Sequence, residues 1–353
     1  MTTRALFAIP GDPETPTGGY VYDARLRAAA GAAGMSLPLL PLTGGFPDPS
    51  AADIDRALAA LARADAPLLI DGLALGTLPG AAIAALPVPV IALLHHPLGL
   101  ETGLTPARRD AMLAVEAAAL AACAHVITTS RTTADTAAEL LGVPRAKLTV
   151  AAPGLDRAPA ARRAGRPAMI LGVGTISRRK GWDVLVEALA QMGDLAWRCT
   201  ILGPDDREPA TAAALRARIA RMEGADPRLA GRLRLTGALD RAALDAAYQG
   251  ADIFCLPSRY EGYGMVATEA MAHGLPVIVS AAGALPEAVG DAGLLVPPDD
   301  PGALAAALRR LLTDTDEADR RAAASHARAA ALPGWDATAA IVAGVLRSHG
   351  ARS

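Results

Sequence analysis

The stretch DIFCLPSRYEGYGMVATEAMAHGLP, residues 252–276, places an apolar run directly before a glycine-containing loop and a helical pattern. Ile253–Leu256 has the composition of a buried strand, and Pro257–Gly264 that of a loop. Another apolar run, Val277–Val279, follows the helical pattern. A strand, a helix and a second strand in this order are typical of a parallel sheet with helices packed against it.

Apolar runs of this kind alternate with longer helical patterns along almost the whole chain. The alternation predicts an α/β fold with two similar parallel sheets, that is, two Rossmann-like domains in tandem. Two such domains that face each other leave a cleft, and ligands bind at the carboxyl ends of the strands. The predicted strands are Ala5–Ile9, Leu37–Leu40, Leu68–Ile70, Val88–Leu94, Val126–Thr129, Leu148–Ala151, Met169–Val173, Cys199–Leu202, Leu233–Leu235, Ile253–Leu256, Val277–Val279 and Leu294–Val296.

A stretch without convincing apolar periodicity separates the two halves. Residues 158–167 are rich in Pro, Ala, Arg and Gly, so we expect a linker there between a first domain at 1–157 and a second domain at 168–334. Helices are expected in most gaps between strands. One of them, from Thr105 to about Cys123, begins with a threonine cap followed by Pro106 at the first helical position.

The charge balance argues against a general attraction to nucleic acid. The 353 residues include 34 basic and 36 acidic side chains, for a net charge of -2. No broad positive field is therefore available to hold nucleic acid or an anionic membrane. We expect no nucleic-acid partner and only local recognition of phosphate, and we leave a peripheral membrane contact open.

The cysteines and the apolar runs predict a cytoplasmic protein. Cys123, Cys199 and Cys255 are widely separated within apolar segments, which is typical of buried free thiols in a reducing compartment. The run Ala5–Ile9 is shorter than the apolar stretch of a secretory signal. No run reaches the roughly 20 residues that a membrane helix needs, so we expect no transmembrane segment.

The loop and helix of the opening stretch have the residues to bind a diphosphate sugar. Gly262 and Gly264 permit close backbone approach around Tyr263, and the first amides of the helix can bind an anion. Glu261 lies in the loop and Glu269 about two helical turns later. Carboxylates accept hydrogen bonds from sugar hydroxyls, so one could take a ribose and the other a hexose. The alternative is that one of these glutamates only complements the helix dipole and the other is solvated.

A second cluster contains three consecutive cations. The stretch GVGTISRRKGW, residues 172–182, follows a strand and opens a helix with Arg178, Arg179 and Lys180. These cations could neutralise a diphosphate, the lysine as a point charge and an arginine as a fork. The alternative is a solvated basic turn. The spacing differs from that of the P-loop, and no G-x-G-x-x-G follows the first strand to indicate a nicotinamide site.

The first half offers weaker candidates. Gly18 and Gly19 follow the first strand and lead into a helix, as a glycine turn against a phosphate or sugar would, although most such pairs only turn the chain. His95 and His96 directly follow a strand, and because side chains alternate along a strand, one of them would face the cleft. The alternative is a purely structural histidine. No H-E-x-x-H motif or serine elbow is present, so we expect no metal site and no catalytic triad.

Taken together, these motifs resemble those of the retaining glycosyltransferases of family four. The matching residues are Glu261-x7-Glu269 within Pro-Ser-Arg-Tyr-Glu-Gly-Tyr-Gly, with Arg179-Lys180-Gly181 upstream and His-Gly-Leu-Pro-Val downstream. The resemblance implies the B-type glycosyltransferase fold, with two Rossmann-like domains. It also implies that a last helix, at residues 335–350, packs back on the first domain.

By this resemblance, a nucleoside-diphosphate sugar would be the donor, bound mainly by the second domain, and no cofactor would be needed. Glu269 would take the ribose, Glu261 the transferred sugar, and Arg179 and Lys180 the diphosphate. His95 would lie near the sugar and the acceptor, so that Glu261, His95 and Lys180 form the catalytic set. The remaining donor contacts would come from Gly18, Gly19, Gly262, Tyr263, Gly264, Met265 and Val266.

The implied activity is the transfer of a hexose to an acceptor hydroxyl with retention of anomeric configuration and without a metal. Many members carry an arginine where this chain has Thr175, so Arg179 would have to supply the second positive charge. We expect Lys180 to be exposed, so that its replacement would spare the fold. The alternatives are a sugar-nucleotide epimerase or hydrolase on the same fold, or a non-catalytic nucleotide-sugar-binding module.

Overall fold

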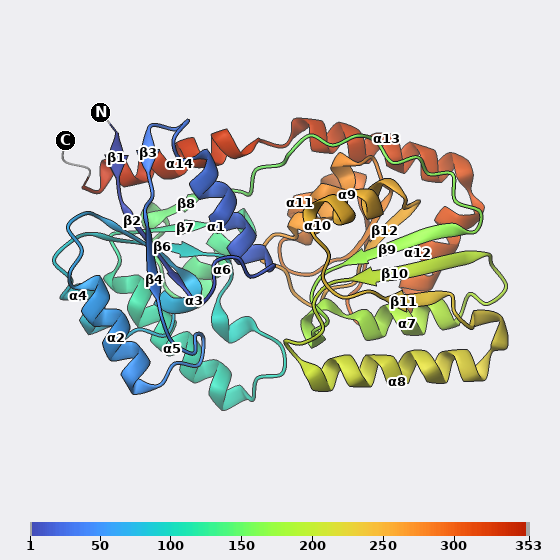
Figure 1. Ribbon diagram of the computed structural model, residues 1–353, viewed down its shortest axis with the longest axis horizontal. Coiled ribbons are helices and arrows are strands. Elements are labelled where there is room, and N and C mark those ends of the chain that lie inside the picture. The colour runs from blue at the N-terminus through green and yellow to red at the C-terminus, as the bar shows by residue number, and fades with distance from the viewer. Residues whose placement is uncertain (1, 351–353) are drawn as a thin grey trace. The chain divides into compact units, whose positions relative to one another are not determined.

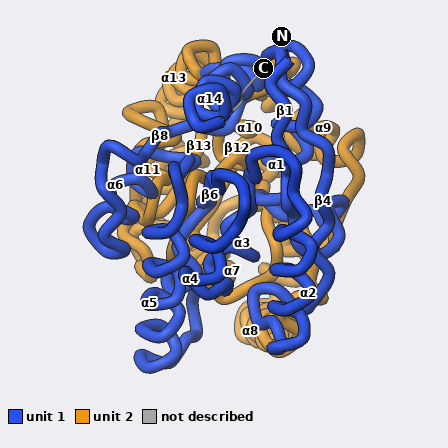
Figure 2. Tube along the Cα trace, turned by 90° about the vertical axis from the view of Figure 1, so that its left-hand side faces the viewer, with its two compact units in different colours: residues 1–154, 333–353 blue, residues 155–332 orange. Residues whose placement is uncertain are grey.

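The computed structural model describes residues 2–350, which form two compact units. Unit 1 contains the chain up to Gly154 together with the chain from Pro333 on, and unit 2 contains Leu155–Leu332 (Figure 2). Each unit has a parallel sheet with helices packed against it (Figure 1). The predicted α/β class, with two similar sheets in tandem, is confirmed.

Within residues 2–350, the main sheet of unit 1 has six parallel strands in the order β4-β2-β5-β6-β7-β8. The chain starts at β2, adds β4 on one side and then continues on the other side from β5. The strand order therefore reverses between β2 and β5, which is where parallel α/β sheets bind ligands. The strands are β2 (Leu6–Pro10), β4 (Leu39–Leu42), β5 (Leu68–Asp71), β6 (Val90–Leu94), β7 (His125–Thr128) and β8 (Leu148–Val150).

One helix of unit 1, α5 (Pro106–Ala122), begins at the cap that the sequence indicates. α5 starts at Pro106, and the side chain of Thr105 accepts a hydrogen bond from the backbone N–H of Arg108, which confirms the predicted cap. Two short strands that we did not predict, β1 (Thr3–Arg4) and β3 (Met35–Ser36), pair in parallel outside the main sheet. The other helices before residue 155 are α1 (Gly18–Ala29), α2 (Ala51–Leu61), α3 (Gly72–Leu75), α4 (Gly80–Ala84), α6 (Arg131–Leu140), and the 3-10 turns η1 (Leu98–Leu100) and η2 (Arg145–Lys147).

The last helix, α14 (Trp335–Ser348), packs within unit 1. The Tyr22 hydroxyl of α1 donates to the carbonyl of Ala151 at 2.8 Å, and the Tyr22 and Trp335 rings meet edge to face with centroids 5.4 Å apart. Thr338 donates to the carbonyl of Ala152 at 2.7 Å. These contacts join α1, the end of the β8 segment and α14, so the C-terminal helix is part of the first core.

Within the described chain, unit 2 also has a six-stranded parallel sheet, in the order β11-β10-β9-β12-β13-β14. Its strand order reverses between β9 and β12. The strands are β9 (Ala168–Val173), β10 (Trp197–Leu202), β11 (Leu233–Leu235), β12 (Ile253–Leu256), β13 (Val277–Ser280) and β14 (Leu294–Val296). The helices and 3-10 turns are α7 (Trp182–Ala190), α8 (Pro209–Ala225), α9 (Arg241–Gln249), α10 (Met265–Ala272), α11 (Leu285–Val289), α12 (Pro301–Thr313), α13 (Thr315–Ala331), η3 (Arg178–Lys180), η4 (Pro227–Leu229) and η5 (Gly290–Ala292).

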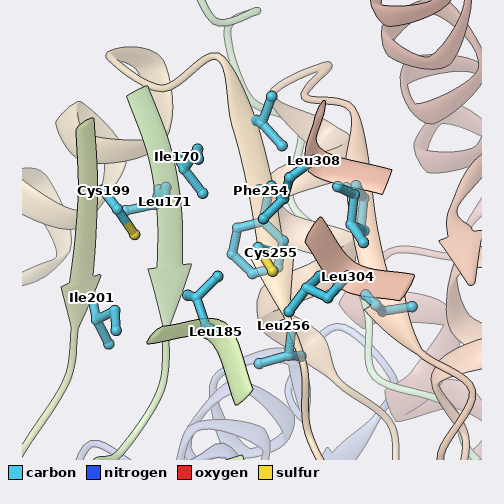
Figure 3. Packing of buried hydrophobic residues seen from close by; sticks show 14 of the residues in the cluster. Ile170, Leu171, Leu185, Cys199, Ile201, Phe254, Cys255, Leu256, Leu304 and Leu308 are labelled. Atoms are coloured by element: carbon cyan, nitrogen blue, oxygen red, sulfur yellow. The ribbon is translucent and has the colours of Figure 1, made fainter. Parts of the chain in front are cut away.

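The core of unit 2 is made by branched and aromatic side chains of the central strands and by one face of each flanking helix. Leu304 and Leu308, one turn apart on α12, belong to the same buried cluster as Phe254 of β12 (Figure 3). Cys199 and Cys255 lie in this core as free, buried thiols, as predicted. Because both faces of the sheet are covered, the strands are apolar runs rather than alternating ones.

The segment predicted as a linker is attached to unit 2 rather than lying between the units. The backbone N–H of Ala161 donates to the carbonyl of His273 at 2.7 Å, and that of Arg162 to the carbonyl of Gln249 at 3.1 Å. The Asp252 carboxylate accepts from the N–H of Gly165 at 3.1 Å. The boundary therefore falls between Gly154 and Leu155, because the polar backbone of the segment is satisfied by the ends of α9 and α10.

By length and composition, one helical stretch in the described chain, residues 315–348, is apolar enough to cross a membrane, although 39% of its most apolar window is buried. The stretch consists of two helices, since α13 ends at Ala331 and α14 begins at Trp335. They have 17 and 14 residues, each fewer than the roughly 20 of a membrane span.

If α14 belongs to the core of unit 1, its buried Leu346 should matter for that unit alone. We expect Leu346→Ala to lower the free energy of unfolding of unit 1 by about 2–5 kcal/mol, because it removes a fully buried side chain. Leu308→Ala in α12 is the matched control for unit 2. Hydrogen exchange measured by mass spectrometry should show faster exchange in α1 for the first variant and in unit 2 for the second. Unchanged exchange in α1 would contradict the assignment.

Candidate active site

Two loops of unit 2 come together where its strand order reverses. β9 and β12 are hydrogen-bonded neighbours, with Ile170 opposite Ile253 and Leu171 opposite Phe254. The loop that contains Arg178, Arg179 and Lys180 follows the carboxyl end of β9. The loop that contains Glu261 follows the carboxyl end of β12 (Figure 1). The two clusters found in the sequence therefore share one edge of one sheet, although about 80 residues separate them.

An ion pair joins these loops. The Nζ atom of Lys180 lies 2.6 Å from Oε1 of Glu261, and the Ser258 hydroxyl donates to the same oxygen at 2.7 Å. The Arg179 guanidinium lies 3.2 Å from Oε2 of Glu261 and also donates to the carbonyl of Tyr260 at 2.9 Å. Both oxygens of the buried carboxylate thus have partners.

The charges around Glu261 decide its protonation. Burial alone would raise the pKa of this carboxyl, but the Lys180 ammonium and the Arg179 guanidinium outweigh it and hold the pKa at about 2. The group is therefore ionised at neutral pH. Lys180 is buried, not exposed as we predicted, because its ammonium reaches into the protein to this carboxylate.

The three consecutive cations do not act as one patch. Arg179 and Lys180 face Glu261, whereas Arg178 is exposed and lines a separate cavity of about 180 Å³ on the side of α8. Arg218 and Arg259 also line that cavity, and both are held by carboxylates. Only two of the three predicted cations therefore belong to the Glu261 cluster.

Glycines allow the two loops to approach each other. Gly181 has a φ of +67°, and a Cβ at that position would lie 2.1 Å from the carbonyl oxygen of Pro257. Gly264 has a φ of +96°, and a Cβ there would lie 2.5 Å from Leu285. A larger residue at position 181 would have to push the loops apart, and one at position 264 would clash with the Leu285 side chain of α11.

Gly264 is also the N-cap of α10, so Met265 and Val266 form the first turn of that helix. The first amides of a helix have no partner within it, and together with the helix dipole they favour an anion. The side chain of Tyr263 is buried, and burial raises its pKa to about 12. Tyr263 therefore stays neutral. A ligand at residues 262–266 would contact backbone groups rather than a charged side chain.

Glu269 lies on α10 and is held by two residues of α9. Its Oε1 lies 3.2 Å from Arg241, and its Oε2 accepts from the Tyr248 hydroxyl at 3.1 Å. Burial raises its pKa, with Arg241 acting against the shift. Arg241 and Tyr248 were not predicted as site residues, because nothing in their spacing links them to the E-x7-E motif.

The predicted residues of unit 1 lie at the edge of its own sheet. Gly18 and Gly19 begin α1, and a Cβ on Gly19 would lie 3.3 Å from the His95 ring. Nε2 of His95 lies 3.2 Å from Asp23 and 3.1 Å from Asp71. Neither aspartate was predicted, although Asp71 ends a strand and Asp23 lies four residues after Gly19, one turn along the helix.

His96 lies in a different environment. Its Nε2 is 3.4 Å from Glu101, which follows the η1 turn, and the two side chains are 23% and 40% exposed. Within residues 2–350, the group of side chains spaced closely enough to hold a metal ion is Asp23, Asp71 and His95, whose ligand atoms lie within 4.8 Å of one another. Among the side chains that the structure describes, no such group includes the residues around Glu261.

Two family models match this chain in succession. The model described as Glycosyltransferase Family 4 matches residues 23–158, and the model described as Glycosyl transferases group 1 matches residues 167–314. The fold and these matches define a two-domain glycosyltransferase of the B type. The chain belongs to the family-four glycosyltransferases, as its motifs indicate.

Curated relatives match over part of their length. A glycogen synthase of Mycobacterium tuberculosis is 33% identical over 268 residues, which cover 73% of this chain and 63% of that protein. A D-inositol 3-phosphate glycosyltransferase of Kineococcus radiotolerans is 35% identical over 232 residues, 57% of this chain and 52% of that protein. The matched region thus spans about half to two thirds of these relatives.

Solved structures match over nearly the whole chain. Sucrose-phosphate synthase from Thermosynechococcus elongatus has a TM-score of 0.82 and 25% identity, covering 99% of both chains. Anabaena HepE, solved in complex with UDP and glucose, has a TM-score of 0.80 and 20% identity, covering 98% of this chain and 100% of that one. The second similarity shows the fold alone.

The pairing of Lys180 with Glu261 predicts a thermodynamic coupling. Lys180→Met should lower the free energy of unfolding of unit 2 by about 3 kcal/mol, because it removes the closest cation from a buried carboxylate. The double variant Lys180→Met/Glu261→Gln should recover much of that loss, giving a coupling above about 1 kcal/mol in urea unfolding.

The loss caused by Lys180→Met should also depend on pH. The native pKa of Glu261 is about 2, below its ordinary value of 4.5. The ion pair therefore stabilises the fold fully above pH 4.5, and this stabilisation disappears as the pH falls toward 2. A change of less than about 0.5 kcal/mol in Lys180→Met at neutral pH, as for an exposed site, would contradict the pairing.

Proposed function

We propose that the protein transfers a hexose from a nucleoside-diphosphate sugar to an acceptor hydroxyl, with the donor bound by unit 2. The observation that carries this proposal is the cluster of Arg179, Lys180 and Glu261 beside the first turn of α10. It combines two cations and free helix amides for a diphosphate with a carboxylate for sugar hydroxyls. Membership of the family supports the same reading.

The cluster suits a leaving group that gains negative charge. Cleavage of the anomeric C–O bond places an electron pair on the diphosphate, and fixed cations and amides stabilise that charge as it develops. An ammonium has three N–H donors, so Lys180 can bind a phosphate oxygen while it still donates to Glu261. Arg179 would supply the second positive charge, in a chain that has Thr175 in place of the usual arginine.

The two glutamates would divide the donor between them. Glu261 would accept from the hydroxyls of the transferred sugar, next to the diphosphate, and Glu269 from the ribose. Oε2 of Glu269 accepts from Tyr248, which orients the carboxylate and leaves lone pairs for a hydroxyl. The HepE structures contain UDP, UDP-glucose, or UDP with glucose, so uridine nucleotides are the first donors to test.

Unit 1 would supply the acceptor side. Gly18 and Gly19 would approach the leaving group through their backbone, and His95 would lie near the sugar and the acceptor. The reaction would retain the anomeric configuration by attack on the face from which the diphosphate departs. In that route the leaving diphosphate takes the proton of the acceptor hydroxyl, so neither a separate base nor a metal is needed.

The decisive experiment is donor screening followed by turnover. A panel of nucleotide sugars is added to the full chain, and a bound donor should raise the melting temperature with the logarithm of its excess over Kd. The stabilising donor is then incubated with and without hydroxyl acceptors. Transfer only when an acceptor is present supports the proposal. Donor hydrolysis or epimerisation without an acceptor, or tight binding without turnover, would assign one of the other functions.

The division of roles between the glutamates is separately testable. Glu269→Gln should weaken the free nucleoside diphosphate and the nucleotide sugar alike, by roughly 1.5–3 kcal/mol, because it removes a charged acceptor for the ribose. Glu261→Gln should weaken the intact donor and its turnover more than it weakens the free nucleotide. Glu187→Gln, on the exposed side of α7, is the control. Isothermal titration calorimetry measures both ligands, and equal losses in the two variants would show that the roles are wrongly divided.

We propose that transfer needs no metal ion. Arg179, Lys180 and the amides of α10 would together offset the developing charge of the diphosphate, so transfer should be the same within about twofold after treatment with a chelator. The measurement is the initial rate with EDTA and with added magnesium or manganese. Loss of transfer with EDTA and its recovery with one of these ions would overturn this part of the proposal.

A further inference from the structure

Two residues of α9, about two helical turns apart, hold the Glu269 carboxylate of α10. Nη1 of Arg241 donates to Oε1 at 3.2 Å, and the Tyr248 hydroxyl donates to Oε2 at 3.1 Å. The Glu269 side chain is 18% exposed. Each carboxylate oxygen has a second lone pair, so Glu269 can still accept hydrogen bonds from a ligand at its exposed edge.

We propose that Arg241 is a positioning residue for the nucleotide: it fixes Glu269 with its free lone pairs toward the ribose, so the preference for a sugar with ribose hydroxyls depends on Arg241. Arg241 acts through Glu269 and does not bind the nucleotide itself. This inference rests on the proposed function, in which Glu269 accepts from the ribose.

The place of Arg241 in its own helix points to a role outside that helix. α9 begins at Arg241, and the side chain of the N-cap residue Asp240 accepts from the backbone N–H of Ala243 at 2.8 Å. The N-terminus of a helix carries a partial positive charge, so a cation there is unfavourable. Contacts with carboxylates have to offset this cost, and one of them, with Glu269, joins α9 to α10.

The guanidinium of Arg241 is itself held in place. Its Nε lies 3.0 Å from Oδ1 of Asp245, one turn further along α9, while Nη1 faces Glu269. The five N–H donors of a guanidinium lie in one plane, so a single orientation of Arg241 serves both carboxylates. Asp245 therefore fixes Arg241, and Arg241 fixes Glu269.

Tyr248 limits the movement of the second carboxylate oxygen. Its ring is buried and stacks on the His273 ring, with centroids 5.1 Å apart and planes 16° apart. Its hydroxyl also lies 3.2 Å from the carbonyl oxygen of Val266, in the first turn of α10. With one oxygen held by Arg241 and the other by Tyr248, the carboxylate of Glu269 cannot rotate without losing a hydrogen bond.

The charges around Glu269 favour the same role. The groups that contact it are Arg241 and Tyr248, and beyond them His273 lies 4.0 Å from Asp245. Burial raises the pKa of Glu269, while the charge of Arg241 acts against the shift. Loss of Arg241 would favour the protonated carboxyl, which is a weaker acceptor for a hydroxyl than a carboxylate is.

The first test compares nucleoside diphosphates with and without ribose hydroxyls. Isothermal titration calorimetry of the full chain measures the Kd of UDP and of 2′,3′-dideoxy-UDP, or of the matching pair if the donor screen selects another base. We expect the wild type to prefer UDP by about tenfold or more, and Arg241→Met to prefer it by less than about threefold. A purely structural ion pair would change both Kd values by the same factor, and an unchanged ratio would overturn the inference.

The second test asks whether Arg241 acts through Glu269. Glu269→Gln should lower the ratio of the two Kd values, and the double variant Arg241→Met/Glu269→Gln should match Glu269→Gln within about twofold, because both changes remove one interaction. A further loss of the ratio in the double variant would show that Arg241 contacts the ribose directly. That result would overturn its role as a positioning residue.

Two more variants complete the set. Tyr248→Phe keeps the ring against His273 and removes only the hydroxyl, so it should lower the ratio by about twofold or more even if Arg241→Met does not fold. Arg309→Met, in which an exposed arginine of α12 loses its partner Asp194, is the matched control and should keep the wild-type ratio. A lowered ratio in the control would mean that the loss is not specific to Arg241.

The wild-type measurement separates this inference from the proposed function. If the wild type binds UDP and its dideoxy form equally, Glu269 does not face the ribose, and the inference is overturned while the diphosphate site stands. If the wild type binds none of the nucleoside diphosphates, the donor site of the proposed function fails, and the inference fails with it.

Discussion

The ion pair between Lys180 and Glu261 is the interaction on which the site in unit 2 depends. It joins the loops that follow two neighbouring strands at the reversal point of the sheet, and Ser258 and Arg179 complete the coordination of the carboxylate. A buried carboxylate without these cations would shift toward its neutral form or force the loops apart. In the proposed function the same two cations also bind the diphosphate, together with the first amides of α10.

The two units have a polar cluster at the same place in the sheet, but the charges of the two clusters differ. Each has its polar cluster where the strand order reverses, between β9 and β12 in unit 2 and between β2 and β5 in unit 1. The cluster of unit 2 combines two cations with one carboxylate, whereas that of unit 1 combines two carboxylates with one histidine. A donor that carries a diphosphate fits the first set. The set in unit 1 suits a neutral hydroxyl compound better than a phosphate, because its two buried carboxylates would repel the negative charge of a phosphate.

Much of the fold follows from the sequence because apolar runs in covered parallel strands are unbroken and easy to locate. Every predicted strand overlaps an observed one, and Thr105 caps α5 as expected. The short β1–β3 pair was missed, since two residues carry no periodic signal. The site was predicted as a set of residues but not as a network. The burial of Lys180 and the pairing of Asp23 with His95 depend on contacts between distant segments, which one sequence does not reveal.

The central claim is that Lys180, Arg179 and the first turn of α10 form the diphosphate site. The most direct measurement is a crystal structure of the full chain with a nucleoside diphosphate such as UDP. The account predicts phosphate oxygens within hydrogen-bond distance of Lys180 Nζ, the Arg179 guanidinium and the amides of Met265 or Val266, with Glu269 at the ribose. A diphosphate bound instead in the cavity beside Arg178, or in unit 1, would contradict it.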